Sequence, residues 1–179
     1  MSVLASAKQA TAALALQDLE IAYRVRGRDR AVVRGIGIEI GKRQSYGLVG
    51  ESGCGKSTVA LAIVGYLPRN GRVTGGSIEV GGRDVLALRG EALRRYRRDD
   101  VSMVYQNPGS AMNPSLRIGR QLAEVFRLRG ASRTEARERS TAALREVHIA
   151  DPDSVLRRYP HQLSGGMQQR VVIAMALAT

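Results

Sequence analysis

Alternating apolar and polar residues in the first part of the chain predict β-strands. Leu16–Arg24 and Val32–Ile40 alternate over strand-like lengths and are joined by a polar loop that contains Gly27, which favours an antiparallel pair. Gly75–Val80 alternates in the same way between glycine turns and predicts an edge strand. We therefore expect a sheet in the first half of the chain.

Two short apolar runs predict further strands, which would make the sheet mixed. Ser45–Val49 leads directly into a glycine-rich turn, and Ser57–Val64 beyond that turn has helical composition. Val101–Tyr105 is the second run. Between them, the arginine cluster Arg94–Arg98 predicts a short helix, and its simplest interpretation is a solvated face.

The pattern changes to a helical period after Gln106. Ser132 followed by Glu135 predicts a capping box, and the apolar residues Ala136, Ala143, Leu144 and Val147 then fall on one face of an amphipathic helix. Another helix should open at Ser164 and run through an apolar stretch to the last residue. These segments predict a helical subdomain.

Composition fits a globular domain that crosses no membrane. The chain has 179 residues, of which 44% are hydrophobic and 25% charged. The longest apolar run, Val171–Ala178, is far below the roughly 18 residues that a membrane span needs. Met1–Leu16 carries only Lys8 as a charge and makes a poor signal peptide, so we expect a loose tail over residues 1–15. The single cysteine, Cys54, indicates a reducing compartment, the cytoplasm by default.

One segment carries a strong chemical signal. Residues 50–57 match the phosphate-loop pattern G-x-x-x-x-G-K-[ST], between a predicted strand and a predicted helix. Backbone N–H groups of such a loop surround a polyphosphate at a helix N-terminus, which attracts anions. Lys56 would reach the β- and γ-phosphates, and the Ser57 hydroxyl would coordinate Mg²⁺, with Thr58 as a supporting hydroxyl. The expected nucleotide-binding residues are Gly50, Glu51, Ser52, Gly53, Cys54, Gly55, Lys56, Ser57 and Thr58.

A second motif narrows the class of phosphate-loop protein. Leu163, Ser164, Gly165, Gly166 and Met167 would place a serine hydroxyl and glycine amides at another helix N-terminus, a second anion site. This run resembles the signature sequence of ABC-type ATPases. The resemblance implies that the signature of one subunit closes over ATP held by the phosphate loop of another, and hence a dimer.

The resemblance to the ABC family assigns two further residues. Tyr23 is similar to the aromatic residue that stacks on adenine, although a tyrosine on a strand also serves packing. Gln106 resembles the glutamine that contacts Mg²⁺ and senses the γ-phosphate. The runs Tyr105–Pro108, Met112–Pro114 and Tyr159–Gln162 are similar to ATPases of dipeptide, oligopeptide and nickel importers. His161 is then a family marker rather than a metal ligand.

Residues that the family uses for hydrolysis are not in this sequence. The resemblance implies an aspartate that holds Mg²⁺, a general-base glutamate and a switch histidine, all beyond the signature helix, whereas no Asp, Glu or His follows the signature here. We therefore expect nucleotide binding with weak or no turnover by this chain, and a domain that is incomplete at its C-terminus.

Together these observations predict an α/β phosphate-loop NTPase fold of the ABC ATPase type, with an antiparallel β subdomain and an inserted helical subdomain. The expected parts are the tail (1–15), the β subdomain and phosphate-loop core (16–106), the Q-loop and helical subdomain (107–162) and the signature with its helix (163–179). The resemblance implies an importer ATPase, peripheral on the cytoplasmic membrane face, using ATP and Mg²⁺. Its expected partners are a second ATPase subunit, permease subunits and, indirectly, a substrate-binding protein.

Two other functions stay open at this point. One is a hydrolysis-incompetent nucleotide-binding module that regulates a partner. The other is a soluble ABC ATPase acting on nucleic acid, supported only by the net charge of +12, from 28 basic and 16 acidic residues. The arginines are spread along the chain without interleaved aromatic residues, so no nucleic acid is expected as a partner.

Overall fold

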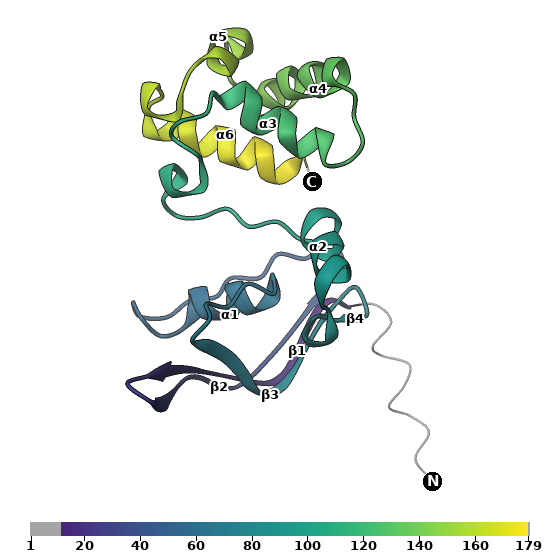
Figure 1. Cartoon of the computed structure of the whole chain (residues 1–179). Helices are drawn as coiled ribbons and strands as arrows, with labels where there is room; N and C mark the ends of the chain where they lie inside the picture. The colour runs from purple at the N-terminus through teal and green to yellow at the C-terminus, as the bar shows by residue number, and fades with distance from the viewer. Residues whose placement is uncertain (1–11, 179) are drawn as a thin grey trace. The chain divides into compact units, whose positions relative to one another are not determined.

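The computed structural model describes residues 12–178, which form two compact units (Figure 1). The first unit extends to Asp100 and the second begins at Val101. Residues 1–11 and 179 lie outside the described residues, and with them most of the expected N-terminal tail. The first strand already begins at Ala12, so residues 12–15 belong to a strand and not to a tail.

The first unit is built on an antiparallel sheet with the strand order β2-β1-β3-β4. The strands are β1 (Ala12–Val25), β2 (Arg28–Gly41), β3 (Gly71–Val80) and the two-residue β4 (Arg83–Asp84). The predicted antiparallel pair β1–β2 is confirmed, and its turn uses two positive φ angles, 49° at Arg26 and 77° at Gly27. β3 pairs with β1 on one side and β4 on the other, so the prediction of an edge strand was wrong.

Two predicted strands are not formed among the described residues, and the sheet is antiparallel rather than mixed. Ser45–Val49 has no regular secondary structure and is exposed, with Val49 at 93% of its full exposure. Val101–Tyr105 is likewise irregular. A strand needs a neighbour that takes up its backbone hydrogen bonds, and none of the four described strands pairs with either segment.

α1 (Lys56–Ile63) packs against β2 and β3, and the short turn η2 (Val85–Ala87) packs against β3. The helix α2 (Gly90–Asp99) follows η2 in the same unit. The predicted helices over these two regions are therefore confirmed. The most deeply buried side chains of this unit include Leu19, Ile21, Ile78, Val59 and Tyr96. Their burial fixes α1, and with it the phosphate loop, against the sheet.

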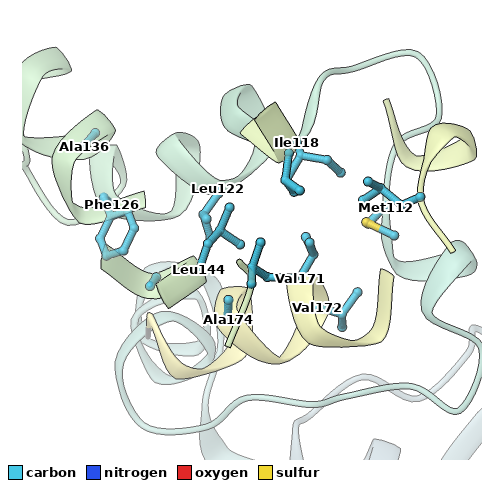
Figure 2. Packing of buried hydrophobic residues seen from close by; sticks show 13 residues of the cluster. Met112, Ile118, Leu122, Phe126, Ala136, Leu144, Val171, Val172 and Ala174 are labelled. Atoms are coloured by element: carbon cyan, nitrogen blue, oxygen red, sulfur yellow. The ribbon is translucent and has the colours of Figure 1, made fainter. Parts of the chain in front are cut away.

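The second unit is helical, as the sequence predicts. It contains α3 (Ile118–Arg127), α4 (Arg133–Glu146), α5 (Pro152–Arg157) and α6 (Gly165–Leu177), with short turns η3 (Pro108–Ala111) and η4 (Pro160–Gln162). Figure 2 shows the apolar faces of α3, α4 and α6 converging on a core that includes Ile118, Leu122, Leu144, Val171 and Ala174. In the described part of the chain, no helix has the length and apolar character needed to cross a bilayer.

The start of α4 confirms the predicted capping box. The Ser132 backbone N–H donates to the Glu135 carboxylate at 2.8 Å, and the Glu135 N–H donates to the Ser132 hydroxyl at 3.3 Å. The hydrogen bond from the Ser132 backbone, followed by that from its side chain, lowers the pKa of Glu135. Two otherwise unpaired donors at the helix N-terminus are thereby satisfied.

Candidate nucleotide-binding site

The phosphate loop wraps the start of α1 and is pinned against β2. Gly53 and Gly55 take positive φ angles of 84° and 95°, which side chains disfavour. Gly55 is buried, and a Cβ there would lie 3.2 Å from the Val32 carbonyl oxygen and 3.3 Å from a Val33 methyl group. A glycine is required at this position because both the backbone angle and the neighbouring strand exclude a larger residue.

The Lys56 side chain lies across the loop that precedes it. Its ammonium donates to the carbonyl oxygens of Gly50 and Glu51, both at 2.6 Å, and lies 3.4 Å from the Cys54 sulfur. An ammonium has three protons, and two of them hold the loop in its curled shape. The third faces the thiol, so a phosphate oxygen would compete with a weak sulfur acceptor rather than with an oxygen.

The first turn of α1 is suited to an anion. Its N-cap, Gly55, provides no side-chain acceptor, and the first turn contains no acidic residue. Residues 50–54 and Ser57 are exposed, so this part of the loop is accessible to a ligand. Backbone donors, a lysine and a hydroxyl oxygen fit a Mg²⁺-bound polyphosphate. Among residues 12–178 there is no group of three or more His, Cys, Asp or Glu side chains that could hold a metal ion.

Tyr23 on β1 lies beside the phosphate-loop helix. Its hydroxyl is 3.4 Å from the Thr58 hydroxyl in the first turn of α1. Its ring lies over Gly71, where a Cβ would come within 2.9 Å of a ring carbon. The structure therefore brings Tyr23 next to the predicted phosphate loop, while its stacking on adenine stays a prediction.

Sequence reasoning missed two residues of α2 that support α1. The Tyr96 hydroxyl donates to the Ile63 carbonyl at 2.6 Å. The Arg97 guanidinium donates to the Val64 carbonyl at 3.2 Å and also to that of Gly65. Both therefore satisfy carbonyl groups at the C-terminal end of α1 that the helix leaves unpaired.

The interpretation of the whole arginine cluster as a solvated face was consequently wrong for Arg97, although Arg94 and Arg95 are exposed. A signal was present in the sequence. Leu93, Tyr96 and Arg97 are spaced to share one face of a helix, which indicates contact with a neighbouring element.

The remaining predicted site residues belong to the second unit. Ser164 caps α6, accepting from the Met167 N–H at 3.4 Å, and Gly165 and Gly166 are exposed with open space where a Cβ would lie. Buried Leu163 anchors the motif in the core of this unit. Gln106 is exposed and lies just before η3, which packs against α6.

His161 near the signature has a packing role. Its ring stacks on that of Tyr159, with 5.7 Å between ring centroids, and the Arg117 guanidinium lies 5.7 Å from the Tyr159 ring centroid. The Gln168 amide donates to the carbonyl oxygens of Pro160 and Leu163 at 2.9 and 3.3 Å. These contacts hold the segment that leads into the signature.

Comparisons with known proteins agree with this arrangement. Residues 33–179 match the sequence profile of the family described as ABC transporter. The chain belongs to the ABC transporter family. It is 41% identical over 166 residues to the dipeptide transport ATP-binding protein DppD of Bacillus subtilis, covering 92% of this chain and 50% of that protein. It is 40% identical over 171 residues to the oligopeptide transport ATP-binding protein OppD of Escherichia coli, covering 95% of this chain and 50% of that protein.

The fold is that of ABC ATPase cassettes. A solved dimeric ATP-binding cassette in a post-hydrolysis state, bound to ADP and phosphate, superposes with a TM-score of 0.80 at 27% identity. The match covers 92% of this chain and 69% of the solved chain. The chain spans about half the length of the curated relatives it matches.

Proposed function

We propose that this chain is part of the ATP-binding subunit of a peptide-class ABC importer, which couples ATP binding and hydrolysis to transport through a membrane permease. The observation that carries the proposal is the phosphate loop, where Lys56 lies across a curled, exposed loop at a helix N-terminus that has no side-chain cap. The identity of 41% and 40% to dipeptide and oligopeptide transport ATP-binding proteins supports the transport class.

Within this proposal, each residue has a definite role. The loop amides and Lys56 would bind the β- and γ-phosphates, and Ser57 and Gln106 would each offer an oxygen ligand to Mg²⁺. Bound Mg²⁺ would neutralise phosphate charge during phosphoryl transfer to water. Tyr23 stacks on the adenine, held in place by Thr58 and Gly71.

The signature segment would act on nucleotide bound by a second subunit. Ser164, Gly165 and Gly166 present a hydroxyl and unobstructed backbone at the start of α6, which suits a γ-phosphate. The partners are then a second ATPase subunit, permease subunits and, through these, a substrate-binding protein. The place of action is the cytoplasmic face of the membrane, where the subunit is peripheral.

A hydrolysis-incompetent nucleotide-binding module is the alternative that the experiment has to separate from this proposal. Hydrolysis uses carboxylates that hold Mg²⁺ and orient water, and no Asp or Glu follows Asp153 in the 179 residues to be tested. We expect this chain to bind Mg²⁺-ATP with little or no turnover, and a version extended to the length of its relatives to hydrolyse ATP.

Alkylation of the single cysteine tests nucleotide binding directly. Cys54 is exposed in the loop, 3.4 Å from the Lys56 ammonium, so bound phosphate should shield it. We expect Mg²⁺-ATP to slow modification of Cys54 by iodoacetamide at least tenfold, measured by mass spectrometry. Lys56→Ala should abolish this protection, whereas Lys42→Ala, an exposed lysine outside the loop, should retain it.

The outcomes separate the two candidates. If Mg²⁺-ATP protects Cys54 only when Lys56 is present, and no phosphate is released, the nucleotide-binding step that both candidates share is supported. ATP hydrolysis by the extended chain would then favour the transporter ATPase. Equal alkylation rates with and without Mg²⁺-ATP, in a folded chain, would refute nucleotide binding at this loop.

A further inference from the structure

Arg30 lies beside Tyr23 on the face of the sheet that carries the phosphate-loop helix. In the antiparallel pair of β1 and β2, Arg30 is directly opposite Tyr23, and the register is regular from Ala22 to the turn. Side chains of directly opposite residues share one face of a sheet, with Cβ atoms about 5 Å apart. The Tyr23 hydroxyl, 3.4 Å from the Thr58 hydroxyl, identifies this face as the one toward α1.

An ion pair on the opposite face confirms the direction of Arg30. Asp29 forms this ion pair with Arg72 of β3. Asp29 is opposite Arg24, and Arg72 is opposite Ala22, so both partners lie one position away from the level of Tyr23. Successive side chains of a strand point to opposite faces. Asp29 is therefore directed away from Tyr23 and is already paired, whereas the next residue is directed toward the face of Tyr23.

The Arg30 guanidinium is available to a ligand. Arg30 is exposed, and among residues 12–178 its side chain has no hydrogen bond, ion pair or contact with an aromatic ring. β2 is an edge of the described sheet, so no described strand covers Arg30 on its far side. The residue opposite Tyr23 on β3 is Gly71, which has no side chain. Of the two cross-strand neighbours of Tyr23, only Arg30 can offer side-chain donors.

The phosphate loop and Tyr23 are joined through the same end of β2. A Cβ at Gly55 would lie 3.2 Å from the carbonyl oxygen of Val32, two positions after Arg30. A nucleotide with its phosphates in the loop and its base on Tyr23 would therefore run along the part of β2 that carries Arg30.

We infer that Arg30 contacts the edge of the nucleotide base and shifts the base preference of this site toward guanine. The inference rests on the proposed function, in which Tyr23 stacks on the base. A guanidinium only donates hydrogen bonds, and guanine presents two acceptors, N7 and O6, on one edge. Adenine presents N7 beside an amino group that also donates. Arg30 can therefore make a bidentate contact with guanine and a single hydrogen bond with adenine.

Nucleotide protection of Cys54 measures the base preference on the whole 179-residue chain. The concentration of Mg²⁺-ATP, Mg²⁺-GTP or Mg²⁺-ITP that halves the rate of alkylation by iodoacetamide gives an apparent affinity. ITP has the N7 and O6 of GTP and lacks its 2-amino group. We expect Arg30→Gln to weaken GTP and ITP binding about tenfold and ATP binding less than threefold.

An analogue without N7 tests the contact atom by atom. The original chain should bind 7-deaza-GTP more weakly than GTP, because one of the two acceptors is missing. Arg30→Gln should bind the two nucleotides alike. Such non-additive losses are expected only where the side chain and the removed atom interact.

Two variants serve as controls. Arg24→Gln removes the same charge from an exposed residue that adjoins Tyr23 but lies on the opposite face, and it should keep the ratio of GTP to ATP affinity. Arg30→Lys keeps the charge and loses the planar fork, so it should lose most of the guanine preference. Each ratio compares two nucleotides on one variant, so a general loss of folded protein or of phosphate affinity does not change it.

The results distinguish failure of this inference from failure of the proposed function. Alkylation that no nucleotide slows in the original chain would refute both. Protection by Mg²⁺-ATP, with the same GTP-to-ATP ratio in the original chain and in Arg30→Gln, would overturn the base contact alone. The base contact is also overturned if Arg24→Gln lowers the ratio as much as Arg30→Gln does, or if Arg30→Gln weakens ITP binding no more than ATP binding.

Discussion

Tyr96 provides a quantitative test of how α2 supports the phosphate-loop helix. Its side chain is fully buried, and its hydroxyl donates at 2.6 Å to the Ile63 carbonyl at the end of α1. Tyr96→Phe keeps the ring and removes the hydrogen bond. We expect a loss of about 1–1.5 kcal/mol in the free energy of unfolding at pH 8, the usual cost of one such bond.

The pH dependence sharpens the prediction. Burial first, and then the charge of Asp100, raise the pKa of Tyr96 to about 12 from the ordinary value of 10.0. Between pH 10 and pH 12, Tyr96 therefore keeps its proton in the folded state and loses it in the unfolded state. The stability that this group contributes is complete below pH 10 and declines toward pH 12. The decline is on the order of 1 kcal/mol by pH 11.

Urea unfolding followed by circular dichroism from pH 8 to pH 11 measures this effect. The advantage of the original chain over Tyr96→Phe should shrink by on the order of 1 kcal/mol across that range. Tyr66→Phe is the control, because Tyr66 is 60% exposed near the same helix end and should behave as the original chain does. Parallel pH profiles for the original chain and Tyr96→Phe would refute the assignment.

Two other predictions concern local structure. Gly76→Ala should cost about 3 kcal/mol or more in the free energy of unfolding, because φ is 80° and the new Cβ would lie 2.3 Å from the Gln17 carbonyl oxygen. Gly81→Ala, where φ is 55° and no atom lies nearby, should cost about 1 kcal/mol. Urea unfolding compares the two variants, and similar losses of stability would contradict the predicted clash at Gly76. Ser132→Ala should destabilise α4 by about 1 kcal/mol. Because the pKa of Glu135 is lowered, its contribution is present above the ordinary carboxyl pKa and lost as pH falls, so acid titration of the original chain should show a decline that Glu135→Gln lacks.

The sequence alone was sufficient wherever the interaction is local. The turn at Gly27 and the capping box of Ser132 and Glu135 each join residues a few positions apart, so spacing and residue type predict them. The phosphate loop is similar, since Gly50, Lys56 and the residues between them form its hydrogen bonds within seven positions.

Tertiary structure decided everything that needs a distant partner. Ser45–Val49 has the apolar pattern of a strand, yet no described strand lies beside it to complete the hydrogen bonds. Arg97 has the same side chain as its exposed neighbours Arg94 and Arg95, and only the position of α1 makes it a hydrogen-bond donor to the helix carbonyls. Arg117 and Arg157 are forty positions apart, and they line one groove of the second unit only because the apolar faces of their helices share one core. Pattern determines which face of an element is buried, but the packing partner determines what that burial brings together.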